Sequence, residues 1–394
     1  MKDLGKKIEF LSKEMLPELI LLRRHLHAHP ELSGQEYQTA AFVAGELRKS
    51  GWEVKEAVGK TGVVAEMGNK NGPVIGLRVD MDALPIEERT GLDYSSSIQG
   101  LMHACGHDLH TCIGLGVAKV LANSKFTTSR IRIIFQPAEE IAQGANWMRA
   151  EKVLEGVQAL FGVHVYPDLS VGKIGIRSGT FTAAAAELEI DIIGKGGHGA
   201  RPHEGTDSIW IAAKVISGLQ EAISRRLDAL KPVVISFGKI SGGNAFNVIA
   251  ERVKILGTVR CLDSQLYEKL PQWIEKIVKN IASNYGAKAN INFKSIAPPV
   301  YNDPELTNLL SDCAKNFMDK EDIVFLENPS LGAEDFAFFL QDVPGTMFRL
   351  GVAGEQGCAP LHSGYFSLDE RSLELGIKIL SQTIVMASKS PQHN

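Results

Sequence analysis

No run of apolar residues in this sequence approaches the roughly 18 to 20 that a membrane-spanning helix requires. The N-terminal segment MKDLGKKIEFLSKEMLPELI mixes charged residues with leucine at helical spacing and contains no signal-peptide core. We therefore expect a cytoplasmic protein with no membrane partner.

Cysteine is scarce, and neither sign of charge dominates. The five cysteines include no Cys-X-X-Cys pair, which argues against a disulfide framework and leaves thiolates free for other chemistry. Lys and Arg number 42 against 46 Asp and Glu, for a formal net charge of -4. This balance gives no excess of basic residues with which to bind nucleic acid, so we expect no nucleic-acid partner.

The 394 residues, 44% of them apolar, are enough for two or three domains with a sizeable core. Helical spacing of apolar residues alternates with short apolar runs that read as strands. The helices are expected at Leu19–His29, Tyr37–Lys49 and Thr111–Ala122, and the strands at Val63–Met67, Val74–Val79, Ile131–Phe135 and Ala159–Val163. This alternation predicts an α/β domain with a mostly parallel sheet, whose ligands bind beyond the carboxyl ends of the strands.

Residues 180–295 follow a different rhythm. Strands with alternating apolar and polar residues surround two helical stretches, at Ser208–Arg226 and Gln265–Tyr285, in the order β-α-β-β-α-β. That order predicts a ferredoxin-like antiparallel sheet with both helices on one face. The α/β pattern then resumes, with helices at Pro304–Met318 and Ser372–Ala387. We expect one domain, residues 1–179 and 296–394, interrupted by a smaller α+β domain of residues 180–295.

Histidines gather in a few short segments, and GLMHACGHDLH is the densest. Cys105 and His107 stand one residue apart where a helix is expected to begin, a position that lowers a thiol pKa and suits metal ligands. Alternatively, the segment is a polar helix start with a compact buried cysteine.

The segment RIRIIFQPAEE places two carboxylates after a strand. Pro137 is expected at the first helical position, with Glu139 and Glu140 in the first turn. Acids at a helix start also complement the macrodipole, which is the simpler explanation. Adjacent carboxylates can instead divide labour, one binding a metal ion and the other activating water.

Two further histidines complete a candidate ligand set. His164 ends an apolar run and His362 lies in a late loop, and each alone fits an ordinary structural residue. Together, four segments offer five ligands for a pair of divalent cations: Cys105, His107, Glu140, His164 and His362. Asp80 and Asp82 end another strand, where they serve either as ligands or, the favoured interpretation, to orient a ligating histidine.

Six ordered motifs resemble the M20 metallopeptidases, in their amidohydrolase branch of aminoacylases, hippurate hydrolases, auxin-conjugate hydrolases and N-acetyldiaminopimelate deacetylases. The resemblance runs from about Arg23 to Asp369. The motifs are HLHAHPELSGQE, LRVDMDALPIEE, MHACGHDLHT, FQPAEE, GKGGHGARPH and LGAEDFAFF.

This resemblance implies a role for individual residues. Cys105, His107, Glu140, His164 and His362 match the family's metal ligands, and Glu139 matches its general base. The inserted domain is implied to be a lid and dimerisation surface, in a homodimer or homotetramer. His198 matches a lid histidine that polarises the scissile carbonyl, and Asn247 a residue that contacts the substrate. Ala250 replaces the usual proline after NVI, which puts the local loop geometry in doubt.

The expected reaction is metal-dependent hydrolysis of N-acyl amino acids, releasing the amino acid and a carboxylic acid. Arg260, in GTVRC, is a candidate for bidentate binding of the substrate carboxylate. One alternative is a metallo-carboxypeptidase or dipeptidase acting on short peptides, and another is an inactive scaffold that keeps the fold. Two divalent ions are expected, and a Cys/His/Glu set accepts zinc, manganese, cobalt or nickel.

Overall fold

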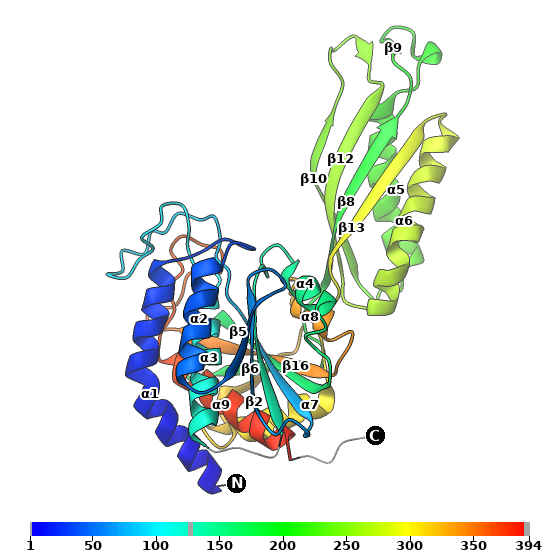
Figure 1. Ribbon diagram of the computed structural model, residues 1–394. Helices are drawn as coiled ribbons and strands as arrows, with labels where there is room; N and C mark the ends of the chain where they lie inside the picture. The colour runs from blue at the N-terminus through cyan, green and yellow to red at the C-terminus, as the bar shows by residue number, and fades with distance from the viewer. Residues whose placement is uncertain (1, 125–128, 390–394) are drawn as a thin grey trace. The chain divides into compact units, whose positions relative to one another are not determined.

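A computed structural model describes residues 2–124 and 129–389 of the chain (Figure 1). The chain divides into two compact units. The first comprises the residues up to Gly179, Tyr301–Asn328 and the residues from Asp335 onward, and the second comprises Thr180–Val300 and Pro329–Glu334. Each unit has its own hydrophobic core. No helix in the described ranges has the length and apolar character to cross a membrane.

The first unit is built on an eight-stranded sheet in the order β1-β2-β4-β3-β5-β16-β6-β15. The neighbours β4–β3, β3–β5, β5–β16 and β6–β15 are parallel, whereas β1–β2, β2–β4 and β16–β6 are antiparallel. The strands are β1 (Glu53–Val58), β2 (Gly62–Gly68), β3 (Val74–Asp80), β4 (Arg130–Gln136), β5 (Val157–Ser170), β6 (Ile174–Ile176), β15 (Ile323–Phe325) and β16 (Gly345–Ala353).

Helices α1, α3 and α9 pack on one another and share the first unit's core with the sheet. Every residue of β3 is buried, as expected of a strand covered on both faces. The helices of this unit are α1 (Lys2–Ala28), α2 (Tyr37–Lys49), α3 (His107–Asn123), α4 (Gly144–Ala150), α7 (Pro304–Ala314), α8 (Phe336–Phe339) and α9 (Ser372–Ala387), with a 3₁₀ turn η2 (Lys320–Asp322).

The second unit is a four-stranded antiparallel sheet in the order β10-β12-β8-β13, with α5 and α6 together on one face (Figure 1). Its elements are β8 (Ala184–Ile193), α5 (Ser208–Arg226), β10 (Val233–Gly242), β12 (Arg252–Cys261), α6 (Ser264–Asn284) and β13 (Lys288–Ala297). This is the predicted β-α-β-β-α-β order. Short pieces complete the fold: β7 (Gly179–Thr180) with β14 (Tyr301–Asn302), β9 (Gly197–His198) with β11 (Val248–Ile249), and η1 (Pro202–Glu204).

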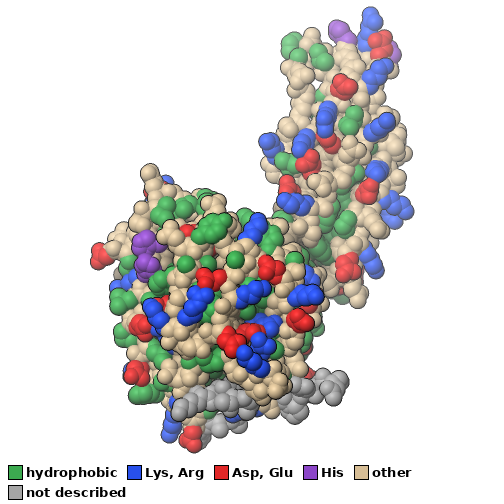
Figure 2. All heavy atoms as spheres, in the orientation of Figure 1, with side chains coloured by type: hydrophobic (Ala, Val, Ile, Leu, Met, Phe, Trp, Pro, Cys, Tyr) green, Lys and Arg blue, Asp and Glu red, His purple; other side chains and the backbone are tan. Residues whose placement is uncertain are grey.

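The predicted fold class is confirmed: a large α/β unit with parallel central strands accompanies a ferredoxin-like α+β unit. Several predicted boundaries were wrong: α3 begins at His107 rather than at Thr111, and β5 runs to Ser170 rather than to Val163. The helix predicted at Leu19–His29 is the C-terminal part of the much longer α1, and the helix from Pro304 ends at Ala314 rather than at Met318. Acidic and basic side chains alternate over the face shown in Figure 2, consistent with the balanced composition.

Candidate metal centre

The candidate metal ligands meet at the carboxyl ends of the central strands. Two overlapping triads have ligand atoms that all lie within 4.8 Å of one another. One triad is Cys105, His107 and His164, and the other is Cys105, Glu140 and His362. The five residues thus come together from four separated segments, and Cys105 belongs to both triads.

His107 is the first residue of α3, and Asp82 holds its ring through the Nδ1 atom. The Nδ1 atom lies 3.0 Å from the Asp82 carbonyl oxygen and 3.2 Å from Asp82 Oδ1, so it carries the proton and donates. The Nε2 atom then faces Glu140, at 3.8 Å from Oε1. His107 Nε2 and Glu140 Oε1 are both buried and have no hydrogen-bond partner in the described parts of the chain. Because such orphaned atoms are costly, the pair fits a site built to hold a cation.

His164 lies inside β5, two residues beyond the last residue of β5 that pairs with β3. Its Nδ1 atom donates to the Val165 carbonyl oxygen at 2.8 Å, which leaves Nε2 at 3.6 Å from Cys105 Sγ. Burial lowers the pKa of His164 well below its ordinary value, and the nearby His110 lowers it further. The ring is therefore neutral, which is the form that ligates metals.

His362 comes from the loop after β16, and its backbone is in the left-handed region at φ 63°. Its N–H group donates to the Ala104 carbonyl oxygen at 2.9 Å, which ties this loop to the residue before Cys105. The Nε2 atom lies 3.4 Å from Glu140 Oε2, and the side chain is 53% exposed. The cluster is thus buried on one side and open to solvent at His362.

The pKa of the Cys105 thiol does not follow the expectation for a cysteine at a helix start. Burial raises the pKa of Cys105 well above its ordinary value, and the Glu140 carboxylate raises it further, while His107 acts in the opposite direction. The prediction of a lowered thiol pKa was wrong for the protein without a cation, because burial and the nearby carboxylates outweigh the effect of His107. A cation would have to displace the thiol proton on binding.

Asp80 belongs to neither triad, but it orients the cluster through its contacts with histidines of α3. Its Oδ1 atom accepts from His110 Nδ1 at 2.6 Å, and His110 Nε2 accepts from the Val165 N–H group at 2.9 Å. Both His110 nitrogens are occupied, so His110 supports the His164 segment and is not a ligand, despite standing three residues after His107. The Asp80 carboxylate lies 3.9 Å from His107 Nδ1. The arrangement fits the orienting role expected of Asp80, and the contacts of Asp82 to His107 fit the same role.

A buried ion network in turn holds Asp80. The other residues of this network were not predicted from the sequence as site residues. Arg78 is fully buried and donates to Asp80 Oδ2 at 2.8 Å, to Asp335 Oδ1 at 3.0 Å and to Gln136 Oε1 at 2.8 Å. Gln136 also donates to Asp335 at 2.7 Å. The available signal was an arginine within the otherwise apolar run VIGLRV, because a buried charge needs partners.

The segment that carries Glu139 and Glu140 is a turn, not the predicted first turn of a helix. Residues 137–143 are non-helical, and α4 begins only at Gly144. Ala138 and Ala142 have left-handed backbones, at φ 54° and 51°. One carboxylate oxygen of Glu139, one of Glu140 and one ring nitrogen of His107 all lie within 4.8 Å of one another, so the three residues form a further group of possible ligands. Glu139 therefore borders the two triads.

In the second unit, His198 and Asn247 lie side by side. The short strands β9 and β11 pair His198 with Val248, and Gly199 N–H donates to the Asn247 carbonyl oxygen at 2.8 Å. The Ala200 N–H group donates to His198 Nδ1 at 3.1 Å, so the neutral ring carries its proton on Nε2. Both side chains are exposed. Ala250, at the position of the expected proline, is buried directly after β11.

Arg260 lies away from these two residues. Strand β12 pairs with β8 from Arg252, near the β9–β11 end, to Cys261 at the opposite end. Because a strand rises about 3.3 Å per residue, Arg260 is roughly 25 Å along the sheet from Arg252. Its guanidinium donates to the Leu331 carbonyl oxygen at 3.2 Å and to the Val259 carbonyl oxygen at 3.0 Å, and it also bonds Thr258. The structure therefore does not join Arg260 to His198 and Asn247.

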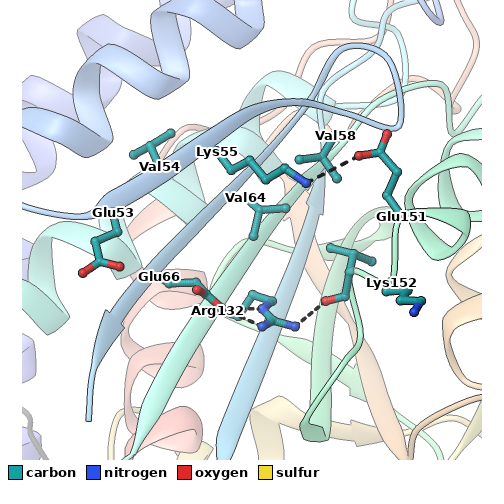
Figure 3. A pocket seen from close by; sticks show the side chains of 10 residues that line it. Glu53, Val54, Lys55, Val58, Val64, Glu66, Arg132, Glu151 and Lys152 are labelled. Carbon is teal, nitrogen blue, oxygen red and sulfur yellow. Dashed lines mark hydrogen bonds and ion pairs between the residues drawn. The ribbon is translucent and has the colours of Figure 1, made fainter. Parts of the chain in front are cut away.

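A hollow of about 300 Å³ lies elsewhere in the first unit, beside β1, β2 and β4 (Figure 3). Two ion pairs lie in it: Lys55 with Glu151 at 3.6 Å, and Arg132 with Glu66 at 2.6 Å. None of the residues that line it belongs to the candidate metal centre, so we assign it no part in the chemistry.

The chain is similar to a known protein family and to several known proteins. Residues 76–386 match the model of peptidase family M20/M25/M40. An N-acetyl-L-cysteine deacetylase of Bacillus subtilis is 40% identical over 359 residues, covering 90% of this chain and 85% of the relative. The thermostable carboxypeptidase 1 of Saccharolobus solfataricus is 40% identical over 382 residues, covering 95% of this chain and 96% of the relative.

Among solved structures, the chain is similar to the YXEP protein of Bacillus subtilis, described as a dinuclear metal-binding peptidase of family M20. The two superpose with a TM-score of 0.84 at 35% identity, covering 95% of this chain and 99% of the other.

Proposed function

This chain belongs to peptidase family M20/M25/M40 and is a hydrolase, and from that premise we propose that it cleaves the amide bond of N-acyl amino acids with the help of two divalent cations. The observation that carries the proposal is the meeting of five ligand side chains in two triads that share one thiol. A third carboxylate, Glu139, stands beside them.

The residues that would hold the cations are Cys105, His107 and His164 for one, and Cys105, Glu140 and His362 for the other. The orphaned His107 Nε2 and Glu140 Oε1 atoms fit such occupancy. This mixed sulfur, nitrogen and oxygen set suits zinc, manganese, cobalt or nickel. When bound, the two cations supply an acidified water molecule and a Lewis acid for the carbonyl oxygen of the substrate.

Glu139 acts as the general base in this proposal. It takes a proton from the attacking water and returns it to the nitrogen of the departing amine, so the same carboxylate serves both halves of the reaction. Its neighbour Glu140 belongs to one of the two triads and lies close to His107 and His362. The two adjacent carboxylates therefore have separate tasks, proton transfer for Glu139 and cation binding for Glu140.

The second unit contributes the lid in this proposal. His198 Nε2–H stabilises the negative charge that develops on the carbonyl oxygen, and Asn247 beside it contacts the substrate. Arg260 stays the candidate for a substrate carboxylate, although its present partners are two backbone carbonyl groups and the Thr258 hydroxyl of its own unit. The open strand edges of β10 and β13 are the surfaces through which we propose a homodimer, with a homotetramer as the larger alternative.

A second candidate function is a metallo-carboxypeptidase or dipeptidase, favoured by the 40% identity to a thermostable carboxypeptidase. Both reactions free an amino acid and differ in whether the acyl part is itself a peptide. A panel of N-acetyl-L-cysteine, N-benzoylglycine and L-alanyl-L-alanine, with release of free amine as the measurement, separates them. Preference for the first two supports the proposal, and preference for the dipeptide supports the alternative.

The role of Glu139 is tested by Glu139→Gln in the metal-loaded protein. We expect turnover to fall by at least about 10³-fold, because the amide cannot accept the water proton, while the bound metal, measured by elemental analysis, stays at the wild-type level. Turnover that survives this substitution would remove Glu139 from the mechanism.

A further inference from the structure

The turn that carries Glu139 is held in an unfavourable backbone conformation. Ala138 and Ala142 both occupy the left-handed region, which an alanine side chain disfavours. The turn folds back on itself: the Gln143 and Gly144 N–H groups both donate to the Ala138 carbonyl oxygen, at 3.2 and 3.1 Å. A Cβ atom on Gly144 would lie 1.6 Å from the Pro137 carbonyl oxygen, so the close approach requires glycine. Such a turn persists only where its surroundings stabilise it.

Glu36 supplies part of that stabilisation from a distant segment. Its side chain is fully buried between the HPELS segment and the start of α2. Oε1 accepts hydrogen bonds from the N–H groups of Ala138, at 2.9 Å, and Gly34, at 2.8 Å. Oε2 accepts from the Thr61 hydroxyl at 2.5 Å. The carboxylate thus holds the amide of the residue directly before Glu139.

The same segment also reaches the other flank of Glu139. Asp82 Oδ2 accepts from the Glu140 N–H group at 3.0 Å and from the Ser33 hydroxyl at 2.6 Å. Residues 33–36 therefore contact both sides of Glu139: Glu36 binds Ala138 directly, and Ser33 reaches Glu140 through Asp82. The proposed mechanism gives the motif HPELSGQE no role, and these contacts give it one.

We propose that Glu36 is a positioning residue for the general base: by holding the Ala138 amide, it fixes the left-handed turn and with it the direction in which Glu139 leaves the backbone. The inference rests on the proposed role of Glu139. Catalytic groups need placement within about 0.5 Å of the productive geometry, and a displacement of about 1 Å can lower a rate by about 10²-fold. A buried acceptor aimed at the neighbouring amide provides such placement.

The test compares two substitutions at the same carboxylate. Glu36→Leu removes the acceptor for Ala138 with little change of volume, whereas Thr61→Val removes only the hydrogen bond on the opposite oxygen. We expect Glu36→Leu to lower kcat by about 10- to 100-fold at unchanged KM and unchanged metal content. Thr61→Val should keep kcat within about 3-fold of wild type, and Glu36→Gln should restore most of the activity, because its amide oxygen can still accept from Ala138.

A second readout does not need the metal or the reaction. Hydrogen exchange of the 138–144 amides in metal-free protein should be faster in Glu36→Leu than in wild type or Thr61→Val. If the leucine variant does not fold, Glu36→Ala replaces it, because the smaller side chain admits water to the freed amides.

The results that would overturn the proposal are a folded Glu36→Leu protein with wild-type kcat and exchange, or an equal loss of kcat in Thr61→Val. Failure of the metal-loaded wild-type protein to hydrolyse any member of the panel would instead contradict the proposed function, and the exchange comparison would still decide the role of Glu36 in the turn.

Discussion

At the scale of single residues, Cys105 has the most distinctive position in the candidate centre. It is shared by both triads, its thiol is buried, and its raised pKa makes it a poor nucleophile without a cation. Cys112, seven residues after Cys105 and within α3, is also buried but belongs to no group of possible ligands among the described residues. The comparison of the two cysteines therefore tests the proposed metal-binding role of Cys105 against ordinary packing at Cys112.

Replacing Cys105 with Ala should lower the metal content from two ions per chain to fewer than one, because both triads lose a ligand. Cys112→Ala should keep both ions and lower stability by only about 1 kcal/mol for the small cavity. Elemental analysis after dialysis against a weak chelator gives the metal content, and urea unfolding gives the stability. A Cys105→Ala protein that still holds two ions would show that the thiol is no ligand.

At the scale of elements, buried charges join α1 to the start of α3. Arg23 on α1 donates to Asp108 Oδ2 at 2.7 Å, and His27 donates to the same oxygen at 2.8 Å. His27 also donates to Glu88 Oε1, at 3.2 Å, from the loop after β3. Asp108 follows His107, so the network fixes the helix turn on which a candidate metal ligand stands. Burial alone would lower the pKa of His27, but Asp108 and Glu88 together raise it above its ordinary value.

This raised pKa predicts a pH dependence of stability. A histidine whose pKa is higher in the folded than in the unfolded protein stabilises the fold fully below the unfolded value of 6.5, and that stabilisation is lost as the pH rises through the folded value. In metal-free protein, the free energy of unfolding should therefore fall above pH 6.5, and His27→Gln should reduce the slope. Glu88→Gln should reduce it less, because Asp108 stays in place. Identical slopes in wild type and His27→Gln, measured by urea unfolding, would exclude this contribution.

At the scale of the whole molecule, each unit has the means to fold by itself. Separate hydrophobic cores fill the two units, and the main segment of the second unit begins and ends at neighbouring points, where Phe181 N–H donates to the Val300 carbonyl oxygen at 2.8 Å. Residues Pro329–Glu334 join this unit separately. The candidate metal ligands all belong to the first unit, whereas His198 and Asn247 belong to the second. Metal binding and substrate chemistry are thus assigned to different units in our proposal.

Replacing residues 182–299 with a short glycine-serine turn should give a folded protein that binds metal but does not hydrolyse the panel. In the full chain, His198→Ala should lower kcat by about 10²- to 10³-fold with unchanged metal content, because one donor to the developing oxyanion is lost. Circular dichroism, elemental analysis and amine release measure the three properties. Hydrolysis at the wild-type rate by the shortened protein would contradict the lid role of the second unit.

The sequence by itself determined the architecture, because periodicity is local. Strands β2, β3 and β4 and helices α2, α5 and α9 match their predicted positions, since burial of one or both faces imposes a spacing that is visible within each segment. The candidate ligands were also visible as residue types after strand ends, and parallel strands bring such positions to one edge of a sheet.

Only the tertiary structure decided which of these side chains face the cluster and what holds them. His107 and His110 stand on the same helix, yet contacts from Asp82, Asp80 and Val165 give one a free nitrogen and occupy both nitrogens of the other. The turn at Ala138, expected as a helix, donates a hydrogen bond to Glu36, 102 positions away. Partners so distant in the chain leave no trace in local spacing, which is why the placement of Arg260 and the roles of Glu36 and Arg78 emerged only from the fold.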